Sequence, residues 1–304
     1  MVRASISERT TFRWDLAEEL VALRSHGFEA ISLWRPKLSD LEAGVARRML
    51  TAAGVRISSL QWAGGFTGSD GRTFHESLVD AREAILEAAD LGTDALLVHA
   101  GCRGGHTLGH ARRLVHEALE SLAPLAEEHG VRLALKPTHP AASAGCGFFT
   151  DLEETLRFLE QVGHPAIGLA LDLWHVGHQQ DLLGLLPQLS NQLVTVSVAD
   201  RLGPPTDAHE RLAPGDGSLP LESLMAALVA SGYDGAVEFE FVADPLETVE
   251  HAPADIPYGS TLPSVHAGYH HALRKIQQAA KRYGCQPWSL QSTRPQQPAP
   301  TPGS

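Results

Sequence analysis

The chain has 304 residues, of which 43% are hydrophobic, and this is enough apolar material for a large buried core. It has 24 lysines and arginines against 36 acidic residues, and the formal net charge of −12 repels the phosphates of nucleic acids and anionic lipid head groups. Because no run approaches the ~20 apolar residues that span a bilayer and the first residues do not resemble a signal peptide, we expect a cytoplasmic protein without a nucleic-acid or membrane partner.

Short apolar runs rich in β-branched residues recur along the chain and predict eight β-strands. In chain order the strands are expected at 2–7, 28–34, 55–62, 94–100, 131–136, 166–173, 193–199 and 236–241. Segments with the helical period lie between and after them, at 15–27, 39–54, 75–91, 109–129, 150–163, 180–190, 220–231 and 264–283. Three of these segments begin at an Asp, Ser or Thr that can cap a helix and end at a glycine.

Eight strands that alternate with eight helices predict an α/β protein made of a single (β/α)8 TIM barrel, which we assign to residues 1–284. An open, doubly wound parallel sheet is the alternative. Residues 285–304 are rich in Pro, Gln and Ser, and this composition predicts a disordered tail.

Side chains alternate between the two faces of a strand, so the apolar positions of each predicted strand identify the face that packs on the helices. The residues between them then point into the barrel. The last inward positions of the fourth to the eighth strand are His99, Lys136, Asp172, Ser197 and Glu240. We expect these five side chains to form a ring at the carboxyl-terminal mouth of the barrel, where the active sites of barrel enzymes lie.

Three acidic side chains, those of Asp172, Glu238 and Glu240, are expected to point into one cavity. Their repulsion favours a nearby cation, which Lys136 and Arg132 could supply. One interpretation is a purely structural ion pair. Alternatively, Glu240 removes a proton from the carbon next to a carbonyl while Lys136 polarises the carbonyl oxygen. A Schiff base on Lys136 is a third, less favoured alternative, because neighbouring carboxylates favour the protonated amine.

The order of several motifs resembles that in the xylose isomerase-like barrels, over about residues 1–284. These motifs are "GFEAISLW" after the first predicted helix, "LDLWH" closing strand six, "VAD" closing strand seven, "RLAPGDGSLPLESL" and "SGYDGAVEFE". That superfamily contains sugar and sugar-phosphate isomerases, ketose epimerases, inosose dehydratases and endonuclease IV. The resemblance implies an isomerase or epimerase, with a dehydratase as the second class of enzyme.

In the epimerase branch, a Glu, an Asp, a His and a Glu on strands five to eight bind a divalent metal. The resemblance therefore implies Asp172 and Glu240 as ligands of Mn, Mg or Zn, and His175, three residues after the Asp, as a ligand of substrate oxygen. Lys136 stands at the position of the strand-five Glu and Ser197 at that of the His. Because a protonated lysine offers no ligand atom and repels cations, we expect the altered site to bind metal poorly.

The predicted function is therefore proton transfer next to the carbonyl group of a small, polyhydroxylated, sugar-like substrate, with Glu240 and Lys136 as the catalytic residues. The predicted substrate-binding residues are His175, His99, Ser197, Arg201 and Trp62. A catalytically inactive barrel that binds a sugar-like ligand or a partner protein through the altered metal site is the alternative.

Overall fold

In a computed structural model, eight parallel strands form a closed barrel in sequence order, and β8 pairs with β1. The structure describes residues 2–39, 41, 42, 44–142, 147–205, 211–240 and 263–286. The strands are β1 (Arg3–Ser7), β2 (Ala30–Trp34), β3 (Arg56–Gly64), β4 (Ala95–His99), β5 (Arg132–Leu135), β6 (Ile167–Asp172), β7 (Leu193–Val198) and β8 (Ala236–Phe239). The predicted TIM barrel is thereby confirmed and the open sheet is excluded. From residue 287 on, the predicted tail lies outside the described residues.

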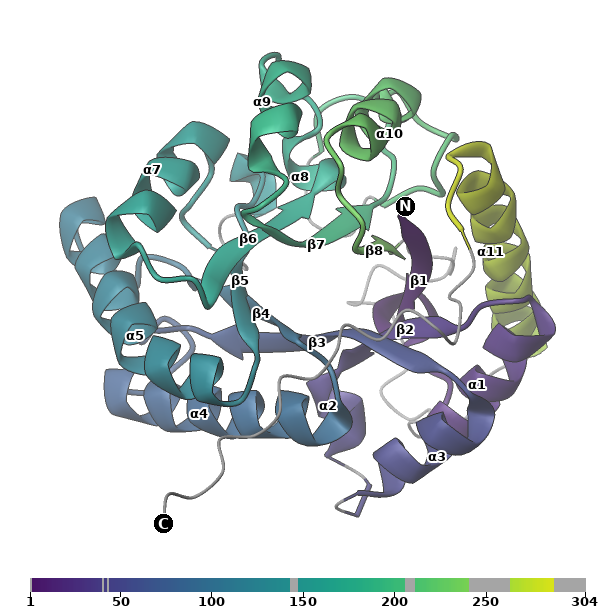
Figure 1. Cartoon of the computed structure of the whole chain (residues 1–304), viewed down its shortest axis with the longest axis horizontal. Helices are drawn as coiled ribbons and strands as arrows, with labels where there is room; N and C mark the ends of the chain where they lie inside the picture. Colours follow the sequence, from purple (N-terminus) through teal and green to yellow (C-terminus); the bar gives the residue numbers. More distant parts are fainter. Residues whose placement is uncertain are drawn as a thin grey trace, which may run out of the picture.

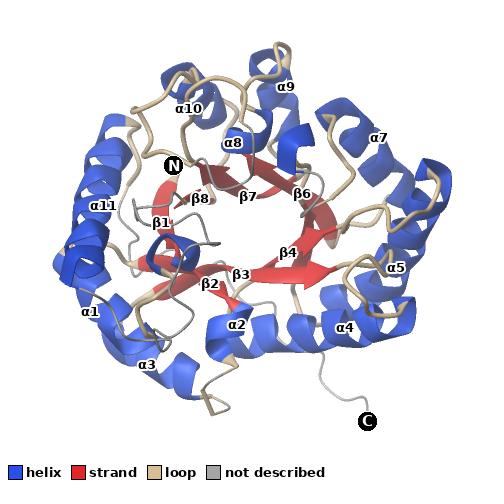
Figure 2. Cartoon of the chain, turned by 180° about the vertical axis from the view of Figure 1, so that it is seen from behind, coloured by secondary structure: helices blue, strands red, loops and turns tan. Residues whose placement is uncertain are grey.

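The longer helices form an outer ring around the strands, as Figures 1 and 2 show. They are α1 (Leu16–Ser25), α3 (Val45–Ala53), α4 (Phe74–Leu91), α5 (Leu108–Glu128), α7 (Leu152–Val162), α9 (Leu182–Leu189), α10 (Leu221–Ala230) and α11 (Pro263–Arg282). All of them correspond to predicted helices. The sequence did not predict four short helices: η1 (Glu8–Thr11), α2 (Arg35–Leu38), η2 (Pro140–Ala142) and α8 (Leu173–Val176).

One of the predicted helix starts has the expected cap, since the carboxylate of Asp15 accepts a hydrogen bond from the N–H of Glu18. α7 is capped in the same way by Asp151 and not by Thr150, at which the predicted segment begins. The predicted start at Ser39 is wrong, because α3 begins at Val45. Ser39 instead ends α2, where its hydroxyl donates to the carbonyl of Pro36.

The alternation of the strands separates a large outer core from a small inner one. Leu133 and Leu135 belong to the outer core between strands and helices. Leu97, Ala134 and Ala170 form a second apolar cluster from the opposite face of their strands. Buried serine and threonine side chains occupy further positions of the strands, at Ser5, Ser32, Ser58, Ser59, Thr195 and Ser197. The barrel interior is therefore partly polar, as the predicted strand faces require.

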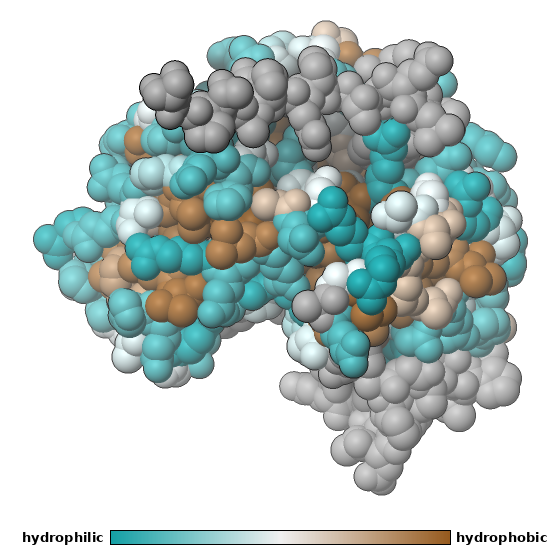
Figure 3. Space-filling view, turned by 60° about the horizontal axis from the view of Figure 1, so that its bottom comes forward, coloured by the Kyte–Doolittle hydropathy of each residue, from teal (hydrophilic) through white to brown (hydrophobic). Residues whose placement is uncertain are grey.

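The outer surface mixes polar and apolar side chains. On the face drawn in Figure 3, hydrophilic residues lie between small groups of apolar ones, which is typical of helices that bury only one side. Within the described part of the chain, the longest helices are too polar for any of them to cross a bilayer.

Candidate active site at the mouth of the barrel

A buried ion pair joins the ends of β5 and β6. Lys136 directly follows β5, Asp172 ends β6, and the Nζ atom of the lysine lies 2.7 Å from Oδ2 of the aspartate. The second oxygen, Oδ1, accepts the N–H of Trp174 at 3.0 Å and so caps α8. Burial by itself would raise the pKa of Asp172, but the positive charges of Arg211 and Lys136 hold it well below its usual value. Asp172 is therefore ionised.

A second cation, Arg211, lies between the two acidic residues of the mouth. Its Nη2 atom donates to Oδ2 of Asp172 at 2.9 Å, and its Nε atom lies 3.4 Å from Oε1 of Glu240. The guanidinium carbon lies 4.7 Å from the ring centroid of Trp174, so the indole packs against a cation within the protein. Sequence reasoning missed Arg211 because it belongs to the loop between β7 and α10, where strand alternation makes no prediction.

Asp200, at the start of this loop, fixes the position of Arg211. Its carboxylate accepts three backbone N–H groups, those of Arg201, Gly215 and Leu219, at 2.8, 3.0 and 3.1 Å. The backbones of Asp200 and Leu212 also exchange two hydrogen bonds, at 2.9 and 2.8 Å. Because Leu212 adjoins Arg211, this pairing holds the arginine at the mouth.

Glu240 follows β8 and has three polar partners. Its Oε2 accepts the hydroxyl of Ser7 at 3.0 Å, and its Oε1 accepts the Nη1–H of Arg9 at 3.1 Å and lies near Arg211. Burial would raise the pKa of Glu240, but Arg9, Arg211 and Lys136 together lower it to about 2. Arg9 was also missed by sequence reasoning, since it lies in η1, beyond the predicted first strand.

His175 presents a neutral imidazole to the ion cluster. Burial holds its pKa well below the usual value. Its Nδ1 atom accepts the backbone N–H of His139 at 2.9 Å. Its Nε2 atom lies 3.8 Å from Oδ2 of Asp172 and 3.2 Å from Nη2 of Arg211. Both ring nitrogens of His175 therefore face N–H donors, because the guanidinium of Arg211 can only donate.

The other predicted substrate-binding residues lie in three different places. His99 ends β4, and its ring packs edge-to-face on that of Trp62, with centroids 5.0 Å apart and the indole 40% exposed. Ser197 is buried and pairs in register with Asp172. Arg201 is buried too, and it donates to the carbonyl oxygens of Trp174 and Gly203.

The predicted pairing of Lys136 with Arg132 around three carboxylates is wrong in two respects. Arg132 is the first residue of β5, at the opposite end of the barrel, and it donates to the carbonyls of Leu193 and Asn191. Glu238 lies two residues before Glu240, deeper in the barrel, where the hydroxyl of Ser58 donates to it at 2.9 Å. Burial raises the pKa of Glu238 to about 7. Arg211 and Arg9 supply the charge that we expected from Arg132.

The residues at the mouth do not fit a divalent metal. Every carboxylate oxygen of Asp172 and Glu240 already accepts a hydrogen bond from the protein, and three of the donors are the cations Lys136, Arg211 and Arg9. A metal bound to these oxygens would lie next to fixed positive charges. Across the described residues, no three or more His, Cys, Asp or Glu side chains are grouped so that they could hold a metal ion.

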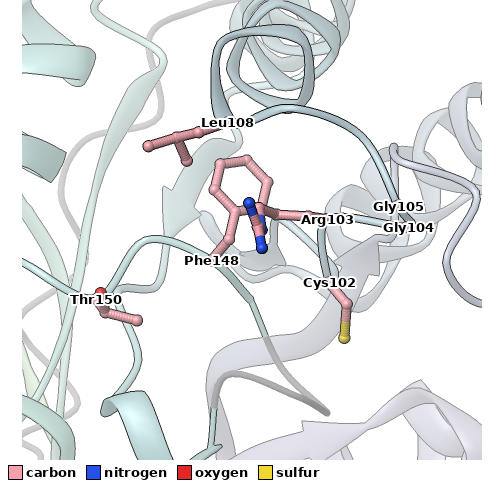
Figure 4. A pocket seen from close by; sticks show the side chains of 7 residues that line it. All are labelled: Cys102, Arg103, Gly104, Gly105, Leu108, Phe148 and Thr150. Carbon is pink, nitrogen blue, oxygen red and sulfur yellow. The ribbon is translucent and has the colours of Figure 1, made fainter.

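A separate cavity of about 470 Å³ lies between the loops that follow β4 and β5. Figure 4 shows the side chains that line it, which are those of Cys102, Arg103, Leu108, Phe148 and Thr150, together with Gly104 and Gly105. None of these residues belongs to the ion cluster. The cavity and the ion cluster therefore have different lining residues.

Comparison with known proteins relates this chain to a family of barrels. A family model described as xylose isomerase-like TIM barrel matches residues 20–262. A Streptomyces coelicolor protein provisionally named hydroxypyruvate isomerase is 30% identical over 250 residues, which cover 74% of this chain and 85% of that protein.

Two further proteins are similar to this chain. A 3-dehydroshikimate dehydratase of Pseudomonas putida is 24% identical over 75% of this chain, which spans only 36% of that enzyme. The crystal structure of protein SMc04130 from Sinorhizobium meliloti superimposes with a TM-score of 0.75 at 28% identity, covering 89% of this chain and 97% of the other.

Proposed function

Because the chain belongs to the xylose isomerase-like TIM barrel family, we propose that it is an enzyme that moves a proton at the carbon next to a carbonyl group of a small, sugar-like compound. One observation carries this proposal. Lys136 and Arg211 both contact Oδ2 of Asp172 at the mouth, and Nε2 of His175 lies 3.8 Å from the same oxygen. Such a group of fixed donors stabilises the negative charge that forms on the oxygen of an enediolate.

In the proposed reaction, the ionised carboxylate of Glu240 takes the proton from the substrate carbon. The electrons of the broken C–H bond form the enediolate, whose oxygen receives hydrogen bonds from Lys136 and Arg211. The hydroxyl proton of the enediolate then moves to its other oxygen, and return of the first proton from Glu240 to the neighbouring carbon completes an isomerisation. Loss of a hydroxyl group from the next carbon would instead give a dehydration, which is the second reaction that we consider.

The low pKa of Glu240 makes it a weak base in the free protein, because Arg9 and Arg211 stabilise its charge. A substrate whose oxygens also bind these two arginines would share that stabilisation. The carboxylate would then become more basic when the substrate is bound. Both relatives with enzyme names support this chemistry, since isomerisation of a hydroxy ketone and elimination of water next to a carbonyl share their first step.

A second candidate function, ligand binding without catalysis, is favoured by one observation. The oxygens of Asp172 and Glu240 are all engaged by donors within the protein, as they would be in a purely structural ion network. The two functions differ in whether a bound compound exchanges its protons.

The test is proton exchange in deuterated water, followed by NMR with hydroxypyruvate and with simple ketoses. We expect loss of the signal of the proton next to the carbonyl, and a decrease in rate of about 100-fold or more in Glu240→Gln. Glu222→Gln is the matched control, because Glu222 is an exposed glutamate that also pairs with an arginine, Arg282. Binding that calorimetry detects without any exchange would support the second candidate and contradict the first.

A further inference from the structure

We infer that Gln61 is a positioning residue for the proposed base, and that it acts through Ser7 on the carboxylate of Glu240. This inference rests on the proposed function, because it concerns the group that takes the proton. It assigns to the reaction a side chain that lies outside the ion cluster.

The first argument is a chain of hydrogen bonds that leads from β3 to Glu240. The Nε2 atom of Gln61, on β3, donates to Oγ of Ser7, the last residue of β1, at 3.3 Å. The hydroxyl of Ser7 donates in turn to Oε2 of Glu240 at 3.0 Å. β8, which precedes Glu240, pairs with β1 in the closed barrel (Figure 1). Gln61 therefore reaches the proposed base through one hydroxyl group.

The second argument is that the charge of Glu240 fixes the direction of this chain. The pKa of Glu240 is lowered to about 2, so the carboxylate is ionised and can only accept. Ser7 has one hydroxyl proton, which must point to Glu240, and its oxygen is then left to accept from Gln61. If the amide were turned over, its oxygen would face the oxygen of Ser7 with no proton between them. Gln61 therefore keeps the hydroxyl proton of Ser7 on Glu240.

The third argument is that Gln61 is anchored on a second strand. Its Nε2 atom also donates to Oγ of Ser32, on β2, at 2.7 Å. The hydroxyl oxygens of Ser32 and Ser59 lie 2.7 Å apart, so this contact extends back to β3. Both N–H groups of the amide are therefore engaged, and the amide is held in place before a substrate arrives.

The protonation of the neighbouring acid, Glu238, does not change the direction of the chain. The hydroxyls of Ser58 and Ser59 both bind Glu238, whose pKa is about 7. Any reversal of these hydrogen bonds ends at Gln61, because its NH2 group can only donate to a serine oxygen. The contact between Gln61 and Ser7 is therefore the same whether Glu238 is ionised or neutral.

Gln61 and Ser7 are too deeply buried to bind a substrate themselves. Gln61 is 2% exposed and Ser7 is fully buried. Arg9, which contacts the other oxygen of Glu240, is 35% exposed. The oxygen next to Arg9 therefore faces the accessible side of the mouth, and Gln61 acts on the carboxylate from behind. Its loss should change the alignment of the base and the rate of proton transfer, and not the affinity for substrate.

The first test separates kcat from KM in the exchange of protons by hydroxypyruvate. Gln61→Met, which keeps the length of the side chain but has no N–H, and Ser7→Ala should each lower kcat by about tenfold or more and leave KM unchanged. Ser5→Ala is the matched control, because Ser5 is a buried serine of the same strand that hydrogen-bonds Ser58 at 2.7 Å. This control should change neither constant.

The double variant shows whether Gln61 acts through Ser7. Gln61→Met combined with Ser7→Ala should lose no more of kcat than Ser7→Ala alone, because the two side chains form one chain of contacts. Losses that multiply, a change confined to KM, or an equal loss of kcat in Ser5→Ala would overturn the inference.

The second test does not require catalysis. The two side-chain N–H protons of Gln61 give signals in a 15N NMR spectrum, which are identified by their loss in Gln61→Met or, if that variant does not fold, in Gln61→Glu. Ser7→Ala and Glu240→Gln should both shift the proton that points to Ser7, whereas Ser5→Ala should leave both signals in place. Unchanged signals in Glu240→Gln would contradict the inference. If the signals shift as expected in a protein that exchanges no substrate protons, the proposed catalysis fails and the action of Gln61 on Glu240 stands.

Discussion

The ammonium group of Lys136 lies 2.7 Å from Oδ2 of Asp172, and both side chains are almost fully buried. Because Arg211 approaches the same oxygen to 2.9 Å, the aspartate has two cationic partners. Neither cation can be removed without exposing the other charges of the cluster to repulsion or to desolvation. The stability of the fold and the electrostatics of the mouth therefore depend on the same few contacts.

Replacing Lys136 by methionine should lower the free energy of unfolding at pH 7 by about 3 kcal/mol, because Asp172 then keeps only Arg211 as a buried cationic partner. Urea denaturation measures this change. Lys275→Met is the matched control: Lys275 pairs with Asp216 at the surface, and such a pair contributes about 1 kcal/mol or less. Equal effects of the two substitutions would show that Lys136 is solvated.

The difference in the free energy of unfolding between Lys136→Met and the wild type should become smaller at acid pH. In the wild type the pKa of Asp172 lies below its unfolded value, so its contribution to stability is present above the unfolded pKa and is lost as the pH falls through the folded one. Loss of Lys136 raises the pKa of Asp172 in the folded state, so Asp172 becomes protonated at a higher pH in the variant than in the wild type. Denaturation at pH 7 and at about pH 4 would measure this narrowing, and a constant difference would contradict the predicted charge of Asp172.

Glu238 should give the opposite pH dependence. Burial raises its pKa from 4.5 to about 7, so the folded state binds a proton that the unfolded state releases. The stability gained in this way is complete below about pH 4.5 and is lost as the pH rises to 7, for a total of about 3 kcal/mol. Glu238→Gln cannot titrate and should gain stability relative to wild type between pH 5 and pH 8. Substitution of the exposed Glu83 by Gln should leave the pH profile unchanged.

Gly217 should not tolerate a side chain. A Cβ atom there would lie 2.3 Å from Oδ1 of Asp200 and within 2.6 Å of the backbone of Arg201. Gly217→Ala should therefore destabilise the protein by roughly 1–3 kcal/mol, because it displaces the loop that positions Arg211. Gly184→Ala, in α9, meets nothing within 4 Å and should stabilise the fold by about 0.5–1 kcal/mol. Thermal denaturation measures both changes. Equal shifts of the melting temperature in the two variants would contradict this explanation.

The sequence predicts the barrel and the acidic pair because both follow from local patterns. The alternation of side chains between the two faces of a strand assigns Asp172 to the inner face of β6 without any knowledge of its partners. Arg211 could not be assigned in this way, since its position depends on hydrogen bonds between Asp200 and residues up to 19 positions away. The available signal was an arginine shortly before the "PGDG" turn, after an aspartate that closes a strand. Arg9 could be placed at the mouth only from the course of η1 after the first strand, and the strand pattern does not predict that course.

A metal centre should form when Lys136, Ser197 and Arg211 are all replaced. Lys136→Glu with Ser197→His supplies two ligand groups on either side of Asp172, because Ser197 pairs in register with Asp172 and Lys136 contacts it. These two changes alone should fail, since Arg211 still contacts Asp172 and Glu240. Adding Arg211→Ala frees Oδ2 of Asp172 and removes one of the two arginines that contact Glu240, the other being Arg9, so the triple variant should bind manganese through Asp172, Glu240 and the two introduced side chains.

The expected measurement is the melting temperature with and without manganese. A ligand that binds only the folded state stabilises it by mass action, by about 2.7 kcal/mol at a concentration 100 times its Kd. The triple variant should show this rise, whereas the wild type, the double variant and Arg211→Ala alone should not. A rise in the double variant equal to that in the triple would mean that Arg211 does not block the site. A folded triple variant that binds no manganese would mean that positions 136 and 197 do not face a common point with Asp172 and Glu240.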